Sequence, residues 1–236
     1  MKILLSIVSH NQRHLVERLL FSLDQYLKKQ LEGLIVCVTE NDKKEIWENK
    51  YKKFSIYFIR NVHPKGFADN HNSAFSYFSP DIFLVVNPDI VFFEEFDAQS
   101  IVKSLTKNSI ASPIILNNDM KREDFLRKDL TPWDLFKRKV FKKEILVKNF
   151  DWMAGMFLIF DGCLFEKLKG FDTRFFLYVE DCDICIRAKN QLFAELKTID
   201  NFSVQHLAQR DSHRNSKYFI WHLSSICKYW IKKLSS

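Results

Sequence analysis

The sequence is poor in glycine and lacks the glycine motifs of common nucleotide-binding sites. Its 236 residues contain five glycines, and no two of them form a G-x-G pair or a G-K-[ST] sequence. The chain therefore has neither a Rossmann dinucleotide fingerprint nor a P-loop. If a nucleotide binds, side chains and a metal ion must hold its phosphates.

Cysteine is also scarce. There are five cysteines, an odd number without the regular spacing of a disulfide framework, so we expect reduced thiols and a cytoplasmic chain. Cys182 and Cys185 form a single C-x-x-C motif, which is half of a zinc site or a redox pair at most. The carboxylates beside it disfavour thiolate formation, so we favour neither.

Long apolar runs are absent. No run approaches the roughly 20 residues that a transmembrane helix requires. The apolar stretch at residues 1–8 is short and lacks a small-residue cleavage site, so it predicts a buried first strand and not a signal peptide. Any contact with a membrane would be peripheral.

What the chain does contain is a large apolar fraction and an excess of positive charge. Hydrophobic residues make up 47% and aromatic residues 15%, enough for the core of a globular domain. The net charge of +7 favours an anionic partner. Charge alone does not distinguish a nucleotide from a nucleic acid or an acidic membrane surface.

Short apolar segments alternate with helical patterns. The expected strands cover residues 3–8, 34–38, 55–60, 82–86 and 110–116, and the first expected helix covers residues 13–27. This alternation predicts an α/β fold with a mainly parallel sheet, helices on both faces, and ligands at the carboxyl ends of the strands. Polar clusters begin at three of those ends, at Ser9, Glu40 and Asn87.

Two acidic sites stand at the edges of predicted core elements. Asp89 ends an Asn-Pro-Asp sequence after a strand, where it could hold a hard cation; an ordinary turn is the alternative. Glu180, Asp181 and Asp183 open a helix after an aromatic stretch. Capping explains two of these carboxylates, whereas a third in apolar surroundings could serve as a catalytic base. His206 follows a strand-like run and is a ligand only if other ligands lie nearby.

Two segments have distinct compositions. Residues 117–150 are polar and basic, and we interpret them as a variable insertion that covers the site. The C-terminal segment, residues 211–236, places apolar residues on one helical stripe with lysines beside it. This amphipathic helix could lie in a membrane interface or pack against the domain.

Six fragments, taken in order, carry a resemblance to a known family. They begin at Ile7, Glu40, Lys65, Asn87, Asp151 and Gly170, and read IVSHN, EN, KGFADNHN, NPDI, DWMAG and GFD, the last continuing through EDCD to Arg187. In these fragments the chain resembles the inverting family 2 glycosyltransferases of the GT-A fold, within them the bacterial rhamnosyltransferases of O-antigen and related cell-surface polysaccharides. The resemblance covers nearly the whole chain.

The resemblance implies one GT-A domain over residues 1–236. Residues 1–116 would form the donor half and residues 151–210 the acceptor and catalytic half. The donor would contact Ser9, Asn11, Glu40, Gly66, Asn70, Asn72 and Asn87. Glu40 stands where the family usually has Asp, and Asn87 replaces the first carboxylate of the D-x-D motif.

The resemblance also implies the catalytic roles. Asp181 would be the general base beside Glu180, and Asp89 and His206 would hold a divalent cation, Mg²⁺ or Mn²⁺. Trp152 would stack on the acceptor sugar, with Gly155 and Asp183 nearby. The base would deprotonate the acceptor hydroxyl as it attacks the anomeric carbon in one inverting displacement.

The implied donor is dTDP-L-rhamnose, and the implied acceptor is a saccharide on a polyprenyl diphosphate at the inner face of the bacterial inner membrane. A UDP-hexose such as UDP-galactose is the alternative donor. A non-catalytic module that binds polysaccharide or nucleic acid is the alternative from another class. It leaves the acidic sites unexplained, because they would repel a polyanion, so we expect no nucleic-acid partner.

Overall fold

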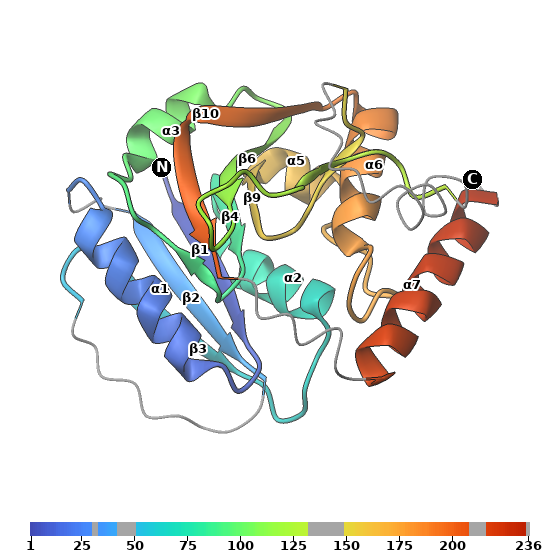
Figure 1. Ribbon diagram of the computed structural model, residues 1–236, viewed down its shortest axis with the longest axis horizontal. Coiled ribbons are helices and arrows are strands. Elements are labelled where there is room, and N and C mark those ends of the chain that lie inside the picture. The colour runs from blue at the N-terminus through green and yellow to red at the C-terminus, as the bar shows by residue number, and fades with distance from the viewer. Residues whose placement is uncertain (30–32, 42–50, 132–148, 208–215, 235–236) are drawn as a thin grey trace.

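The computed structural model describes residues 1–29, 33–41, 51–131, 149–207 and 216–234 (Figure 1). Over these residues the chain is an α/β protein with an eight-stranded sheet flanked by helices, which confirms the predicted fold class. The strands are β1 (Ile3–Ser9), β2 (Leu34–Glu40), β3 (Ser55–Arg60), β4 (Ile82–Val86), β5 (Ile90–Val91), β6 (Ser109–Leu116), β9 (Phe157–Asp161) and β10 (Glu195–His206). A small second sheet pairs β7 (Leu126–Arg127) with β8 (Trp152–Met153).

The central sheet has the order β3-β2-β1-β4-β9-β6-β10-β5. Strands β1 to β4 are parallel, β6 and β10 are parallel to each other, and β9 and β5 run antiparallel to their neighbours. The sheet is therefore mainly parallel, as the alternating pattern predicts. The alternating pattern does not predict the two antiparallel strands, β9 and β5.

The helices cover this sheet and its ends. They are α1 (Arg13–Tyr26), α2 (Phe67–Phe78), α3 (Ala98–Ser104), α5 (Gly162–Lys167), α6 (Glu180–Leu192) and α7 (Ser216–Leu234). After β1 the chain crosses to β2 on one side of β1. After β3 it crosses back to β4, which lies on the other side of β1. Right-handed crossovers in opposite directions put α1 and α2 on opposite faces and create a switch point between β1 and β4.

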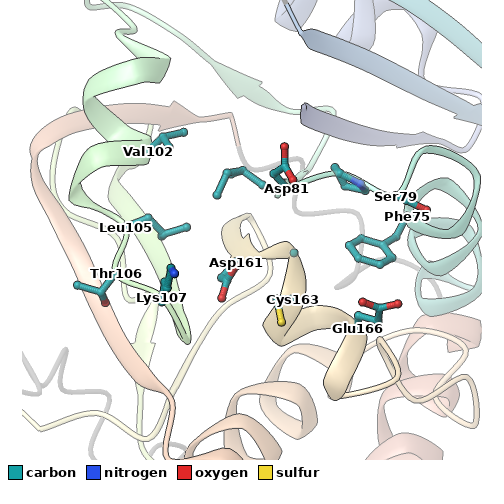
Figure 2. Close-up of a pocket in the computed structure, with 13 residues that line it drawn as sticks. Phe75, Ser79, Asp81, Val102, Leu105, Thr106, Lys107, Asp161, Cys163 and Glu166 are labelled. Atoms are coloured by element: carbon teal, nitrogen blue, oxygen red, sulfur yellow. The ribbon is translucent and has the colours of Figure 1, made fainter. Parts of the chain in front are cut away.

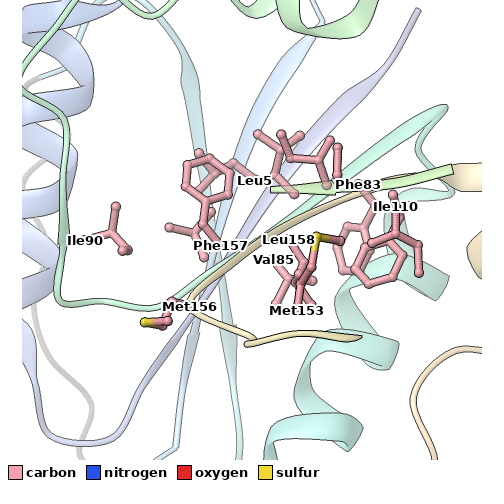
Figure 3. Close-up of a cluster of buried hydrophobic side chains, with 14 of the residues drawn as sticks. Leu5, Phe83, Val85, Ile90, Ile110, Met153, Met156, Phe157 and Leu158 are labelled. Atoms are coloured by element: carbon pink, nitrogen blue, oxygen red, sulfur yellow. The ribbon is translucent and has the colours of Figure 1, made fainter. Parts of the chain in front are cut away.

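The core lies where β1, β4 and β9 meet. All five residues of β4 are buried, because the strand has a neighbour on each side and side chains on both faces. Leu5, Phe83, Val85 and Phe157 come together there, from three different strands (Figure 3). Each large side chain buried in this way contributes about 1.5–3 kcal/mol. The core thus fixes the carboxyl ends of β1 and β4 side by side.

Helix α7 lies at the edge of the molecule, beside α6 (Figure 1). It packs against the domain through Ile226 and Tyr229, which are buried, and the Tyr229 hydroxyl donates to Asp129 Oδ1 at 2.6 Å. Trp230 Nε1 donates to the Leu130 carbonyl, also at 2.6 Å. Of the two arrangements expected for this helix, the structure therefore contains packing against the domain.

The predicted apolar stripe of α7 is divided between two faces. Ile226 and Trp230 face the domain, whereas Ile220, Leu223 and Ile231 are exposed. Leu234 is exposed as well. The helix therefore keeps an apolar outer face while its inner face packs.

The predicted insertion is only partly described. Residues 117–131 fold back along β6, where the Asn117 side chain accepts backbone N–H groups of Asp119 and Lys121 and closes a turn. Residues 132–148, which include most of the basic run expected to cover the site, lie outside the described residues.

Cys182 and Cys185 are free thiols on α6 and are buried in the core. Burial raises the pKa of the Cys182 thiol well above its usual range and raises that of Cys185 to about 12. Both thiols are therefore protonated at neutral pH, a state that neither binds zinc nor attacks a disulfide.

Candidate active site

A pocket of about 290 Å³ lies at the switch point of the sheet. It gathers residues from the carboxyl ends of β1, β2 and β4, from the loop before α2, from the segment before α6 and from α7. Its lining is Val8, His10, Gln12, Asn41, Lys65, Gly66, Phe67, His71, Asn87, Pro88, Asp89, Phe176, Leu177, Tyr178 and Trp221. This is the place where open α/β sheets bind ligands.

A second cavity, of about 470 Å³, lies at the opposite edge of the sheet, between the ends of α2 and α3 and the start of α5 (Figure 2). Two of its carboxylates bond backbone N–H groups from distant parts of the chain: Asp81 Oδ2 accepts from the Lys2 backbone at 2.7 Å, and Asp161 Oδ2 accepts from that of Asn108 at 3.0 Å. Although this cavity has the larger volume, we do not take it as the active site, because ligands of open α/β sheets bind at the carboxyl ends of the strands, where the smaller pocket lies.

Asp89 and His206 meet beside the smaller pocket. Asp89 follows β4, and His206 is the last residue of β10, which pairs with β5 so that His206 lies opposite Ile90. The Leu207 backbone also donates to the Asp89 carbonyl at 2.9 Å. His206 Nε2 consequently lies 3.2 Å from Asp89 Oδ2, although 117 positions separate the two residues.

Glu123 is the second partner of His206. His206 Nδ1 lies 2.8 Å from Glu123 Oε2, so the imidazole stands between two carboxylates. Burial alone would lower the pKa of His206, but the hydrogen bonds to Asp89 and Glu123 outweigh burial and raise it to about 9. The ring is therefore protonated at neutral pH in the metal-free protein.

These residues suit a divalent cation. Asp89 Oδ1 is buried and has no hydrogen-bond partner among the described residues, and His206 Nε2 is directed at the same carboxylate. Among the residues that the structure describes, no three His, Cys, Asp or Glu side chains form a closed metal cage. Two protein ligands suit a cation such as Mg²⁺, whose other positions go to phosphate and water.

The pKa of His206 predicts a pH dependence of stability. Because the folded pKa, about 9, exceeds the ordinary value of 6.5, the stabilisation is complete below about pH 6.5 and is lost as the pH rises through 9. The metal-free protein should lose up to about 3 kcal/mol across this range. Urea unfolding at pH 6 and pH 9.5, with His206→Gln as the control, measures it; an equal loss in the variant would contradict the assignment.

Asp181 lies in the first turn of α6, and backbone groups hold its carboxylate. Gly155 N–H donates to Asp181 Oδ2 and Cys182 N–H donates to Oδ1, both at 2.8 Å. The residue after Gly155, Met156, accepts from Asn87 N–H at 2.9 Å. Two hydrogen bonds and one peptide unit therefore join the base candidate to the end of β4.

Glu180 and Asp181 share one environment but differ in their partners. Burial raises the pKa of Asp181, whereas the N–H groups of Gly155 and Cys182 and the charge of Arg127 oppose that rise. Burial and the neighbouring Asp181 raise the pKa of Glu180 well above its usual range, and its Oε2 has no partner among the described residues. Glu180 is thus the protonated member of the pair and Asp181 the one that can carry charge.

The turn before α6 is strained. Tyr178 and Val179 have φ values of 70° and 75°, and a β-branched residue such as valine rarely adopts this left-handed conformation. Such a residue costs of the order of 1–3 kcal/mol. The turn directs Leu177 and Tyr178 into the pocket and starts the helix that carries Asp181.

A network of asparagines shapes the loop over the pocket. Asn61 Nδ2 donates to Asn41 Oδ1 at 2.9 Å and to Asn70 Oδ1 at 2.7 Å. The side-chain amides of Asn41 and Asn70 both donate to the Lys65 carbonyl, at 2.8 and 3.1 Å. Asn70, expected at the donor, thus holds Lys65 and Gly66 in place, while Gly66 itself lines the pocket.

The other residues expected at the donor are placed unequally. Asn87 lines the pocket, and Ser9 Oγ accepts from the Gln12 backbone at its edge. Asn11 is exposed. The remaining two, Glu40 and Asn72, have protein partners: Glu40 Oε2 accepts from Arg60 Nε at 2.7 Å, and the Asn72 amide bonds the backbone of Phe171 at 2.8 and 2.9 Å.

Trp152 and Asp183, expected at the acceptor, are buried. Trp152 Nε1 donates to the Lys128 carbonyl at 2.6 Å, and the Arg127 guanidinium lies 5.1 Å from the centre of its ring. The Asp183 carboxylate bonds Arg187 Nε at 2.7 Å and also Lys232. Both residues support the site from the interior, whereas Gly155 contacts Asp181 as described above.

Several pocket residues are missed by the sequence analysis. Trp221 of α7 lines the pocket and packs on Phe176, with ring centres 4.9 Å apart. His71 is buried and bonded to Ser6 Oγ at 2.9 Å, and burial lowers its pKa to about 3, so it is neutral. An aromatic residue on an amphipathic helix gives no signal that it will face a pocket, and neither does a histidine inside a helix.

The chain is similar to known glycosyltransferases. It is 28% identical to the rhamnosyltransferase WbbL of Escherichia coli K12, with 71% of each chain covered. Its fold matches the mannosyltransferase PcManGT of Pyrobaculum calidifontis, solved with GDP-Man and Mn²⁺, at a TM-score of 0.69, 13% identity and 98% coverage of this chain. It also matches S. aureus TarS 1–349 with UDP-GlcNAc, at a TM-score of 0.64, 12% identity and 89% coverage.

The chain spans 64% of the length of PcManGT and 59% of TarS 1–349, less than two thirds of either. No family model matches the sequence. A further solved neighbour is GalNAc-T7 with UDP, GalNAc and Mn²⁺, with a TM-score of 0.59 at 14% identity, 88% coverage of this chain and 43% of that one.

Proposed function

We propose that the chain, a glycosyltransferase of the GT-A fold, is a family 2 enzyme that transfers L-rhamnose from dTDP-L-rhamnose, with inversion, to a saccharide carried on a polyprenyl diphosphate. The reaction would belong to the synthesis of bacterial O-antigen or a related cell-surface polysaccharide. The observation that carries the proposal is the contact of Asp89 with His206 beside a pocket whose lining includes Tyr178, three residues before Asp181.

Asp181 is the general base in this proposal. Its carboxylate is held by two backbone N–H groups, and its partly desolvated position raises its affinity for a proton. It accepts the proton of the acceptor hydroxyl as that oxygen bonds to the anomeric carbon and the bond to the diphosphate breaks. One attack from one face inverts the configuration.

The donor diphosphate lies, in the proposal, against the carboxyl ends of β1 and β4. Asp89 and His206 would hold the divalent cation, which when bound neutralises negative charge on the diphosphate. Lys65, Gln12 and neutral His71 also line the pocket, and the His71 ring packs edge-on against Phe67 with ring centres 4.3 Å apart. These residues orient the donor so that its anomeric carbon faces the side of Asp181.

The rhamnose donor is supported by the similarity to WbbL, a rhamnosyltransferase. A UDP-hexose such as UDP-galactose is the second candidate, because two of the solved neighbours carry UDP or UDP-GlcNAc. Both donors leave a nucleoside diphosphate, so the chemistry at Asp181 is the same for either.

The test is a panel of nucleotide sugars, scored by released nucleoside diphosphate with and without a polyprenyl-diphosphate saccharide. Release from dTDP-L-rhamnose that requires the acceptor supports the proposal. Release from a UDP-hexose alone would select the second candidate. Binding without release from any donor would favour a non-catalytic binding module.

The outer face of α7 supports a peripheral position on the membrane that carries the acceptor. In the part of the chain that the structure describes, no helix is long and apolar enough to span a bilayer. Ile220, Leu223 and Ile231 are 62%, 52% and 67% exposed and recur at helical spacing. An apolar stripe on a helix that ends in lysines can lie in the interface of an anionic leaflet.

Replacing Ile220 and Leu223 by Asp together should lower binding to vesicles of anionic lipid roughly tenfold or more, because two apolar side chains no longer enter the interface. Co-sedimentation measures the effect. Tyr77→Asp, which alters an exposed ring on α2, is the control and should bind as the unaltered protein does. Unchanged binding of the double variant would exclude α7 as the membrane contact.

A further inference from the structure

Both ring nitrogens of His206 contact a carboxylate, and the proposed cation accounts for only one of these contacts. Its Nε2 lies 3.2 Å from Asp89 Oδ2, whereas its Nδ1 lies 2.8 Å from Glu123 Oε2. The shorter contact is on the side that faces away from Asp89. Glu123 therefore has a part at this site that the sequence analysis does not assign to it.

The backbone fixes the position of Glu123. Glu123 N–H donates to the Ile115 carbonyl of β6 at 2.8 Å, and an isolated bridge pairs Arg122 with Leu116. The turn between them is closed by the Asn117 side chain and by Asn117 N–H, which donates to the Lys121 carbonyl at 2.8 Å. Because β6 is parallel to β10 and Leu116 lies opposite Gln205, this turn places Glu123 beside the end of β10.

A carboxylate in this place constrains the imidazole in two ways. It accepts a hydrogen bond from Nδ1–H, so that the lone pair available for a ligand is on Nε2, the nitrogen beside Asp89. It also fixes the rotation of the ring about its bond to the chain. Carboxylates that orient metal-binding histidines in this way typically affect metal affinity 10- to 100-fold.

We propose that Glu123 is a positioning residue that orients His206 so that Nε2 is presented, together with Asp89, to the divalent cation. This inference rests on the proposed function for the identity of the site. It adds a residue from the segment that the sequence marks only as a variable insertion.

The test compares Glu123→Ala and Glu123→Gln with Asp119→Asn in the full chain. Asp119→Asn removes one negative charge from the same turn, where the side chain is exposed. Binding of Mn²⁺ with dTDP, and separately with UDP, is followed by the loss of the free-ion EPR signal. Pulsed EPR then detects coupling of the bound Mn²⁺ to the His206 nitrogen, with His206→Gln as the reference that lacks it.

Glu123→Ala should weaken Mn²⁺ binding about 10- to 100-fold and reduce the nitrogen coupling. Glu123→Gln, whose amide oxygen can still accept from Nδ1–H, should recover most of both, and Asp119→Asn should change neither. Equal Mn²⁺ affinity and coupling in Glu123→Ala and the unaltered protein would overturn the proposal, and so would an unaltered protein that binds no Mn²⁺. This experiment measures no sugar transfer. A negative result in the panel of nucleotide sugars would therefore not change what it says about Glu123.

Discussion

Replacing Asp181 by Asn should lower the rate of sugar transfer by about 10²- to 10⁴-fold, the usual contribution of a general base. The amide has nearly the same shape but cannot accept the proton of the acceptor hydroxyl. Binding of the nucleotide should persist, because the pocket that receives it is lined by other residues. Single-turnover transfer and calorimetric binding of the nucleoside diphosphate measure the two quantities separately.

Some loss of stability should accompany this change. Both oxygens of the Asp181 carboxylate accept backbone N–H groups, from Gly155 and from Cys182. An amide can accept only at its oxygen, so one N–H group would face an NH₂ group at a cost of about 1–3 kcal/mol. Glu17→Gln, in a surface pair with Arg13 on α1, is the control and should leave transfer unchanged. Near-normal turnover of a folded Asp181→Asn variant would show that the base lies elsewhere.

Removing the divalent cation should have the second large effect. EDTA should abolish transfer, and Mg²⁺ or Mn²⁺ added in excess should restore it, because charge neutralisation at a leaving diphosphate is worth several kcal/mol. Asp89→Asn should reproduce much of this loss, about 10³-fold, and should raise the Mn²⁺ concentration needed for activity. Initial rates over a range of Mn²⁺ concentrations distinguish weaker binding from slower chemistry.

The control for chelation is EDTA presaturated with Mn²⁺, which should leave the rate unchanged. Full activity in metal-free buffer, together with an unaffected Asp89→Asn variant, would remove the cation from the mechanism. In that case the Asp89–His206 contact would be an ion pair that stabilises the end of β10.

Local periodicity predicts the elements of this fold well. The strands expected at residues 3–8, 34–38, 55–60 and 82–86 lie within a residue or two of β1, β2, β3 and β4, and the expected fifth strand is β6. The reason is that β1, β2 and β4 are buried in the sheet and each flanking helix has one buried face, so hydrophobicity marks them. Strand β3 lies at the edge of the sheet and is only half-buried, and its run of β-branched and aromatic residues marks it instead. Because β1, β2 and β4 are parallel, the polar clusters that follow them lie at the same edge of the sheet.

The site is predictable only in part. Asp89, Asn87 and Gly66 line the pocket, and Asp89 contacts His206. Trp152 and Asp183, which the resemblance places at the acceptor, are buried in contacts with other parts of the protein. Nothing in a one-dimensional pattern tells an exposed aromatic ring or carboxylate from one that an adjacent helix covers.

What the sequence by itself determined is the α/β class and the order of the strands along the chain, because these depend on local composition and spacing. Only the tertiary structure decided that β9 and β5 are antiparallel, that α7 contributes Trp221 to the pocket, and that Glu123 lies beside His206. Those contacts join residues far apart in the chain, and they form because packing and strand register bring backbone segments together, which no local pattern encodes.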